Sequence, residues 1–168
     1  MSYIVEEPIR NRVAESGLIQ LELSDLISID CVELDFTNWL HEGQVVIEKA
    51  FRKTIEEYDF TEFNGKGVGL KVSDDAIIPD WSWMVISSKL ENAEFVVTGG
   101  FKGAQTEALR HAINSIDLEL YKDQRIIVRG CDELAGPEAL LLFQSRVQPV
   151  AKSIMFGEAC STVPVYKK

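Results

Sequence analysis

The chain has 168 residues and a formal net charge of −10 at pH 7, with 46% hydrophobic and 26% charged residues. A chain of this length and composition can bury a core without disulfides and does not have the low hydrophobicity typical of disorder. Its negative field repels phosphate backbones and anionic lipid surfaces, so we expect neither nucleic acid nor a membrane as a partner.

The N-terminal segment, residues 1–58, carries most of the negative charge, with 12 acidic and 5 basic residues. A proline and a glycine bracket a short predicted helix over residues 8–16. Alternating apolar residues predict two strands, at residues 19–23 and 32–36, and the turn residues between them favour antiparallel pairing. Apolar residues at helical spacing then predict an amphipathic helix over residues 44–58.

Residues 59–168 contain a predicted internal repeat with a shift of 58 residues. The ungapped alignment pairs Pro79 with Pro137 and Gly99 with Gly157, and the apolar positions coincide along it. Each copy predicts a strand, a helix that begins at the proline, and a second strand. The first copy has strands at 66–72 and 94–98 and a helix at 79–90; the second has strands at 124–130 and 152–156 and a helix at 137–148.

Strands that alternate with helices of this length pair in parallel through right-handed crossovers. A further predicted helix, residues 103–115, joins the two copies. The expected fold class is therefore α/β, with tandem-duplicated βαβ units forming a mostly parallel sheet and an N-terminal α/β appendage that contains an antiparallel strand pair. We expect one compact domain, with residues 1–58 as the appendage and residues 59–168 as the duplicated core and C-terminal tail.

Three segments carry a resemblance to a known family: residues 150–167 (VAKSIMFGEACSTVPVYK), Gly130-Cys131, and residues 75–81 (DAIIPDW). In these segments the chain resembles a bacterial family, mostly from Bacteroidetes, that is catalogued as domain of unknown function 2480. The resemblance covers essentially the whole chain. It implies no activity, and no site residue follows from it.

The chain holds three cysteines, Cys31, Cys131 and Cys160. They are too few and too scattered for a disulfide framework. No apolar run approaches the roughly 20 residues of a membrane-spanning helix, and the first residues do not resemble a secretion signal. We therefore expect a cytoplasmic protein whose thiols are reduced and are either chemically active or simply buried.

Candidate ligand-binding residues lie at the carboxyl ends of the predicted parallel strands, where open α/β sheets bind their ligands. Asp74 and Asp75 follow the first strand of the first copy, and Cys131 follows the equivalent strand of the second. Glu158 and Cys160 follow the last predicted strand. If the two copies lie side by side with their first strands at the centre, these five side chains gather at one end of the sheet.

Two thiolates with one or two carboxylates could hold a zinc ion in tetrahedral geometry. Cys131 and Cys160 are 29 residues apart, which matches no zinc motif, so ordinary buried cysteines are the simpler alternative. Both cysteines leave the predicted sheet at the same end, and we expect them to lie close together and Cys31 to stand apart. Asp74 and Asp75 could instead serve only the turn before the next helix.

A nucleophilic thiol is a second hypothesis, because Cys131 directly follows a strand. Neither histidine is an evident base for it, since His41 lies near a glycine break and His111 lies in the middle of a predicted helix.

The glycine-rich stretch at residues 99–103 follows a strand and opens a helix, as phosphate loops do. It lacks the spacing of the known phosphate-binding motifs, which favours a role in the turn.

Three functions therefore stay open, and whether the chain is an enzyme stays open with them. The first is a binding protein for a small ligand or a metal at the carboxyl ends of the strands. The second is a small thiol-dependent enzyme that uses Cys131 or Cys160. The third is a non-enzymatic homo-oligomeric or partner-binding module with Trp39, Trp81 or Trp83 as its anchors.

Overall fold

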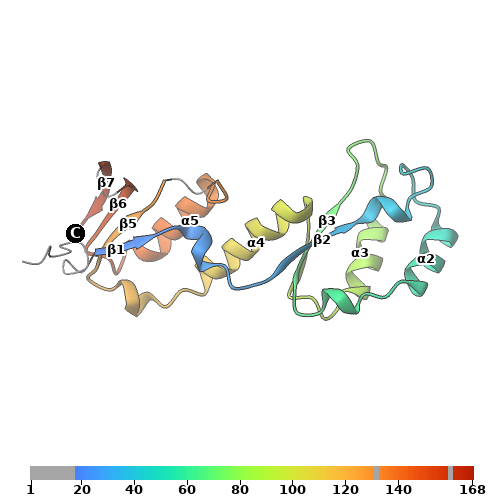
Figure 1. Cartoon of the computed structure of the whole chain (residues 1–168), viewed down its shortest axis with the longest axis horizontal. Coiled ribbons are helices and arrows are strands. Elements are labelled where there is room, and N and C mark those ends of the chain that lie inside the picture. The colour runs from blue at the N-terminus through green and yellow to red at the C-terminus, as the bar shows by residue number, and fades with distance from the viewer. Residues whose placement is uncertain (1–17, 131–132, 159–160) are drawn as a thin grey trace, which may run out of the picture.

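The computed structural model describes residues 18–130, 133–158 and 161–168. In this part of the chain a mixed four-stranded sheet and a parallel three-stranded sheet form two lobes along the long axis, with helix α4 between them (Figure 1). We call the lobe with the four-stranded sheet lobe A and the lobe with the three-stranded sheet lobe B. No described helix is long and apolar enough to cross a membrane.

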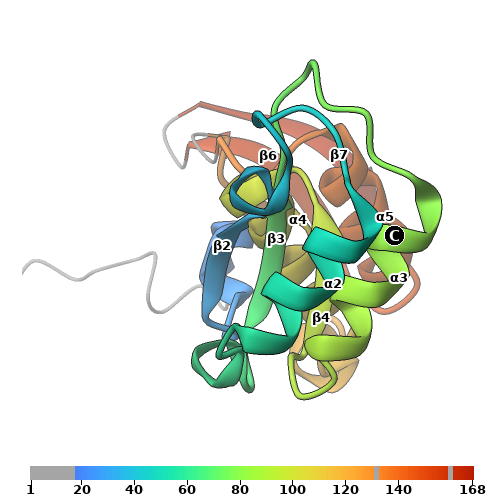
Figure 2. The same cartoon turned by 90° about the vertical axis from the view of Figure 1, so that its right-hand side faces the viewer.

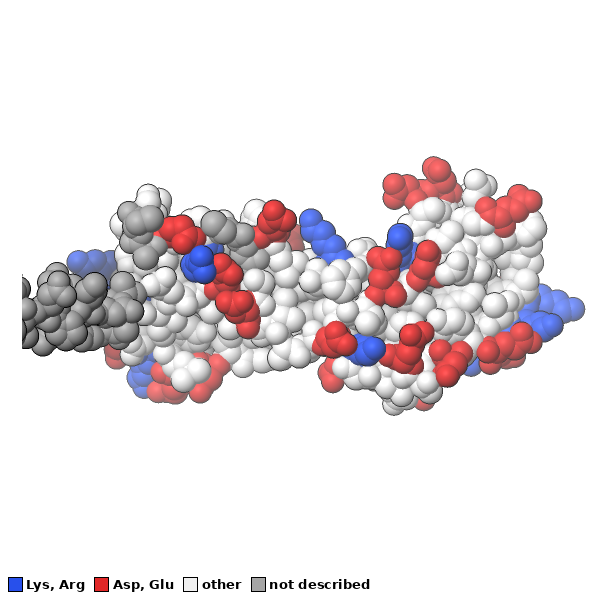
Figure 3. Space-filling view, in the orientation of Figure 1, with Lys and Arg blue, Asp and Glu red and all other residues white. Residues whose placement is uncertain are grey.

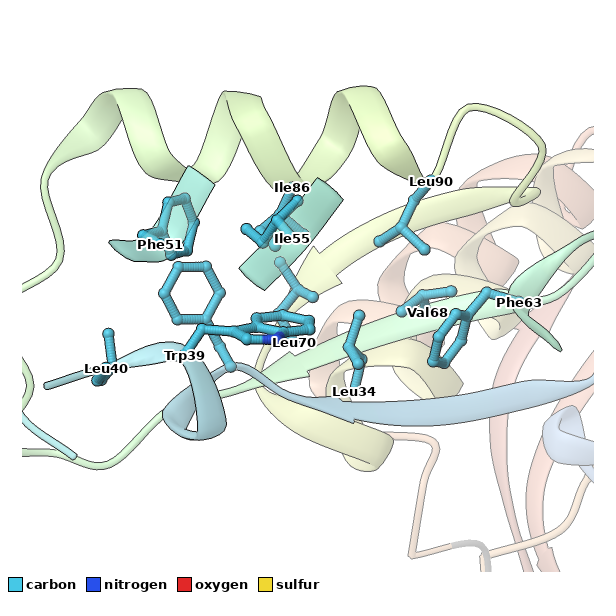
Figure 4. Packing of buried hydrophobic residues seen from close by; sticks show 11 residues of the cluster. Leu34, Trp39, Leu40, Phe51, Ile55, Phe63, Val68, Leu70, Ile86 and Leu90 are labelled. Carbon is cyan, nitrogen blue, oxygen red and sulfur yellow. The ribbon is translucent and has the colours of Figure 1, made fainter. Parts of the chain in front are cut away.

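Lobe B is built on a parallel sheet with the strand order β2-β3-β4. Its strands are β2 (Cys31–Asp35), β3 (Gly67–Lys71) and β4 (Phe95–Thr98). Helices α2 (Glu48–Glu57) and α3 (Asp80–Lys89) cover one face of this sheet (Figures 1 and 4).

Lobe A is built on a sheet with the order β1-β5-β6-β7. Strands β1 (Leu18–Leu21), β5 (Arg125–Val128) and β6 (Ser153–Glu158) are parallel, and β7 (Ser161–Lys167) returns antiparallel to β6. Helix α5 (Pro137–Val147) connects β5 to β6. Short 3-10 helices lie between the main elements of both lobes: η1 (Leu23–Leu26), η2 (Phe36–Trp39), η3 (Thr61–Phe63) and η4 (Leu118–Tyr121).

Helix α4 (Gly100–Asn114) joins the lobes. Its first half crosses sheet B on the face opposite to α2 and α3, because neighbouring residues of β3 point to opposite faces. At Gly69 a Cβ atom would overlap the carbonyl oxygen of Gly100 and lie 3.2 Å from the Cβ atom of Ala104. The second half of α4 places Leu109 and Ile113 in the core of lobe A. The helix is therefore part of both lobes.

Each lobe has its own hydrophobic core, and apolar side chains from helices meet apolar side chains from the sheet in both. In lobe B (Figure 4) the buried residues are Leu34, Phe36, Trp39, Leu40, Phe51, Ile55, Phe63, Val68, Leu70, Ile86 and Leu90. In lobe A they are Leu23, Leu109, Ile113, Tyr121, Ile126, Val128, Phe143, Val147, Ala151 and Ile154.

Aromatic rings dominate the core of lobe B. The ring of Phe36 is fully buried, and its centroid lies 5.6 Å from that of Phe51 and 5.0 Å from that of Trp83. Trp39 is 8% exposed, and Trp81 and Trp83 are half-buried against the same core. The three tryptophans thus pack inside lobe B, and they report on the folding of this lobe.

The α/β class is confirmed, and so are the two predicted strand-helix-strand units with parallel strands. β3-α3-β4 and β5-α5-β6 occupy positions 58 residues apart, and the strands of each unit pair in parallel. Helix α3 begins directly after Pro79, and α5 begins at Pro137. The predicted helices over residues 44–58 and 103–115 correspond to α2 and α4.

The expected antiparallel pair at residues 19–23 and 32–36 is wrong. β1 pairs in parallel with β5, and β2 pairs in parallel with β3. The physical reason lies in the central strands: Val68 and Ile126 are fully buried there, so the backbone of each strand needs a partner on both edges. Each βαβ unit supplies only one neighbour, and the N-terminal strands supply the other.

The expectation that both copies share one sheet is also wrong, since one copy lies in sheet B and the other in sheet A. The C-terminal tail contains a strand, β7, that the sequence pattern did not predict. The helix predicted over residues 8–16 lies outside the described residues. The domain boundary at residue 58 stays a prediction, and each core takes residues from both sides of it.

Candidate functional site

The carboxylates of the predicted site lie at the ends of two different sheets. Asp74 and Asp75 follow β3 in lobe B, whereas Glu158 ends β6 in lobe A. Cys131 and Cys160, the other members of the predicted site, lie outside the described residues. Among the residues that are described, no group of three His, Cys, Asp or Glu side chains is placed to hold a metal ion.

Asp74 and Asp75 lie in an exposed turn. The N–H of Ala76 donates to the carbonyl oxygen of Ser73 at 3.1 Å and closes this turn. The Ser73 hydroxyl donates to the carbonyl oxygen of Gly43 at 3.2 Å and ties the turn to the segment before α2. This geometry agrees with the simpler alternative that the two aspartates serve the turn.

An arginine that the sequence analysis did not select joins the carboxyl ends of sheet A. Arg129 directly follows β5, and its Nη1 atom lies 3.0 Å from Oε1 of Glu22, which follows β1. Its Nε atom lies 3.5 Å from Oε2 of Glu158. The positive charge of Arg129 therefore offsets the Glu158 carboxylate, which makes that carboxylate a weaker ligand for a cation.

The glycine-rich stretch at residues 99–103 shapes the start of α4. Gly99 and Gly100 have φ angles of 95° and 62°, a left-handed conformation that favours glycine. The Phe101 N–H then donates to Oε2 of Glu33 at 3.1 Å, and Nζ of Lys71 lies 3.2 Å from Oε1. The hydrogen bond from Phe101, and then that from Lys71, lower the pKa of Glu33. This carboxylate already occupies the anion position at the helix start, which agrees with a turn rather than a phosphate loop.

The described histidine and cysteine side chains do not form a catalytic pair. Nε2 of His111 lies 2.9 Å from Oε1 of Glu107 on the same helix, α4. Cys31 is half-buried, and burial, followed by the charge of Asp30, raises the pKa of its thiol. A raised pKa keeps Cys31 protonated and weakly nucleophilic at neutral pH.

An apolar groove of about 370 Å³ lies between α5 and strands β6 and β7 of lobe A. Of the described residues that line it, Gln144 alone is polar. Leu141 is 70% exposed, Val163 64% and Val165 52%, so three large apolar side chains border the groove in contact with water. Such a concentration of exposed apolar surface marks an interaction site more often than chance exposure.

Among the residues that the structure describes, no helix covers one flank of α5, and this leaves the groove open. In lobe B the corresponding helix, α3, packs beside α2, which places Phe51 and Ile55 in the core. The described part of lobe A contains no counterpart of α2. A sequence signal for the groove was present: residues 140–143 are four consecutive apolar residues within a helix, and these cannot all face one core.

Comparisons with curated proteins and with solved structures found no match. One family model, described as "Protein of unknown function (DUF2480)", matches residues 7–168. This match confirms the resemblance seen in the C-terminal stretch and in the DAIIPDW segment. Because it covers nearly the whole sequence, the chain belongs to the DUF2480 family.

Proposed function

We propose that the protein binds a small molecule, and that its ligand is an uncharged apolar compound held in the groove between α5 and β7. The groove is the observation that carries this proposal. Its volume of about 370 Å³ lies in the range of small-molecule sites, roughly 300 to 1,000 Å³, and such sites are lined mainly by apolar side chains with few polar groups.

The position of the groove supports the same conclusion. Val128 and Phe156 line it and lie at or near the carboxyl ends of β5 and β6, the end at which α/β sheets bind ligands. A ligand that covers Leu141, Val163 and Val165 gains roughly 25 cal/mol for each Å² of apolar surface removed from water. The class of ligand follows from the lining, which offers no charged partner and a single amide.

The experiment is a fluorescence titration with Nile red, an uncharged apolar dye that the charge of −10 does not repel. We expect saturable binding of one dye per chain. Leu141→Glu and Val165→Glu should each weaken it about tenfold or more, because each places a charge in the apolar site. Both side chains are more than half exposed, so both variants should fold.

The matched control is Met84→Glu, which adds the same charge on α3 of lobe B at a side chain that is 75% exposed. This variant should bind the dye as the wild type does. Equal binding by Leu141→Glu and the wild type would contradict the proposal. So would a dimer that Leu141→Glu dissociates, or dye binding that requires deletion of residues 1–17, because another occupant would then fill the groove.

A thiol or zinc site at Cys131 and Cys160 is a second candidate, supported by the strands that precede these residues. β5 and β6 are parallel neighbours with Val128 opposite Phe156. A Cβ atom at Gly130 would lie 3.9 Å from the Cα atom of Gly157. The two segments are therefore still adjacent at Gly130, one residue before Cys131, and at Gly157, three residues before Cys160. Cysteine thiolates are common zinc ligands.

Zinc analysis of the purified protein and titration of its reactive thiols test this second candidate. Cys131→Ser and Cys160→Ser should each abolish the bound metal or the reactive thiol, whereas Cys31→Ser should leave it intact. If the purified protein contains no zinc and no reactive thiol, both forms of this site are excluded. The proposal for the apolar groove does not depend on that result.

A further inference from the structure

A second groove, of about 470 Å³, follows the outer edge of β2 in lobe B. β2 is a terminal strand in the order β2-β3-β4, and Figure 2 shows β3 and β4 on one side of it. All five residues of β2 line this groove, which is therefore parallel to a sheet edge. Tyr58, Phe63 and Phe101 add aromatic rings to its walls.

The backbone of β2 presents unpaired hydrogen-bonding groups to this groove. The carbonyl oxygen of Asp30 accepts a hydrogen bond from the N–H of Gly67 at 2.9 Å. The backbone N–H and C=O groups of the even-numbered residues of β2 therefore point toward β3. Backbone groups of alternate residues point to opposite edges of a strand, so those of Cys31 and Glu33 point outward. In the described part of the chain no group hydrogen bonds to the backbone of either residue.

β7, an outer strand of sheet A, carries two kinds of residue that hinder the addition of another strand. β7 contains Pro164, which has no N–H, and ends at Lys167, which Lys168 follows. Proline and lysine are among the residues by which edge strands avoid pairing with another chain. β2 contains neither residue.

The negative charge around the groove favours a positively charged partner. Glu33, Asp35 and Glu62 are the described acidic residues that line it, together with Lys66, and Lys71 pairs with Glu33 at 3.2 Å, so acidic side chains still outnumber basic ones around the groove. Residues 28–100, which form lobe B, hold 14 acidic and 6 basic side chains, a net charge of −8. Acidic side chains are also the more frequent on the face of lobe B in Figure 3. The exposed rings of Tyr58 and Phe101 can stack against a cationic side chain.

We propose that the edge of β2 binds an extended peptide segment of a partner protein that carries a lysine or arginine, and that this segment adds a strand to sheet B. Main-chain hydrogen bonds to Cys31 and Glu33 supply affinity, and the carboxylates and rings of the groove supply specificity. The proposal concerns a different lobe from the apolar groove and does not depend on it.

The probe is a capped, fluorescein-labelled peptide of sequence TVKVT, with TVEVT as its matched control, because alternating β-branched residues favour an extended chain. Fluorescence anisotropy with the full chain should show saturable binding of TVKVT and binding of TVEVT weaker by about tenfold or more. Leu141→Glu, in the other groove, should leave both titrations unchanged.

The decisive variant is Cys31→Pro, compared with Cys31→Ala. Proline at the first residue of β2 removes one outward N–H and leaves the bonds to β3 in place, whereas alanine keeps the N–H. TVKVT binding should fall about tenfold in Cys31→Pro and persist in Cys31→Ala. Glu62→Lys, at an exposed position, should reduce the preference for TVKVT over TVEVT.

Several results would overturn the proposal. One is that the wild type binds neither peptide, and another is that Cys31→Pro, folded by circular dichroism, binds TVKVT as well as Cys31→Ala does. A third is that binding begins only after deletion of residues 1–17, since the chain itself would then occupy the edge. A fourth is a dimer that Cys31→Pro dissociates, because a second copy would then be the partner.

Discussion

The two lobes share one plan but leave different surfaces open. Each has a central parallel strand, a helix that follows it and a parallel neighbour on both sides. In lobe B, helices cover both faces of the sheet, and no described residue pairs with the outer edge of β2. In lobe A, β7 covers the edge beside β6, and no described helix covers the flank of α5. The same βαβ plan therefore exposes a polar edge in one lobe and an apolar groove in the other.

The order of the elements along the chain explains this difference. Lobe B is inserted between β1 and the remaining strands of lobe A. The connection from β2 to β3 is local and carries α2, which covers the sheet of lobe B. The connection from β1 to β5 contains the whole of lobe B instead.

The two parts of the chain also differ in charge. Residues 101–168 hold 8 acidic and 9 basic side chains, a net charge of +1, whereas residues 28–100 have a net charge of −8.

The largest expected effect is on the contact between α4 and sheet B. In Gly69→Ala the new Cβ atom overlaps the backbone of Gly100, which cannot move without displacing the helix. We expect a loss of about 3 kcal/mol or more in the free energy of unfolding, measured with urea. Gly136→Ala is the control, because a Cβ atom added there would have no other atom within 4 Å; as Gly136 is the N-cap of α5, this variant should cost about 1 kcal/mol or less. Equal stability of the two variants would contradict the role given to α4.

A second prediction tests whether α4 makes the lobes unfold together. Phe143→Ala removes a fully buried ring from lobe A and should cost about 3 to 5 kcal/mol. All three tryptophans are in lobe B, so their fluorescence reports on the other lobe. The transition seen by tryptophan fluorescence should shift as far as the transition seen by far-ultraviolet circular dichroism. An unshifted fluorescence transition would mean that the lobes unfold independently.

The local parts of this fold could be predicted from the sequence, and the non-local parts could not. Proline positions and the shift of 58 located both βαβ units, because helix starts and crossover lengths are local properties. The partners of β1 and β2 were not predictable in this way, since alternation identifies a strand without saying which edge it joins. The predicted site required that both copies share one sheet. The copies lie in two sheets, so Asp74 and Glu158 lie at the ends of different sheets.

Neither groove was predicted from the sequence, and the physical reasons are related. The run of apolar residues at 140–143 signals an apolar surface on both sides of α5, but the exposure of Leu141 and Val165 depends on which described elements pack beside this helix, and that is not a local property. The free edge of β2 depends on strand order. The prediction that the glycines near Phe101 serve a turn agrees with the structure, because it rested only on local spacing.

The smallest expected effect concerns Glu33 in lobe B. Its lowered pKa means that its carboxylate stabilises the folded chain above the ordinary pKa of a glutamate, and that this stability is lost as the pH falls through the lowered value. Glu33→Gln should therefore show a smaller loss of stability than the wild type between neutral and strongly acidic pH. Urea unfolding across this range measures it, with Glu56→Gln, an exposed carboxylate on α2, as control. An unchanged pH dependence in Glu33→Gln would contradict the capping role.

The most direct test of the proposed function is a methyl nuclear magnetic resonance spectrum of the protein with and without Nile red. We expect shifts confined to methyl groups around the groove, those of Leu140, Leu141, Val163 and Val165. The methyl groups of Ile77 and Met84, which are exposed in lobe B, should not shift. Shifts of equal size at these two residues, or no shift at Leu141 and Val165, would contradict a ligand site between α5 and β7.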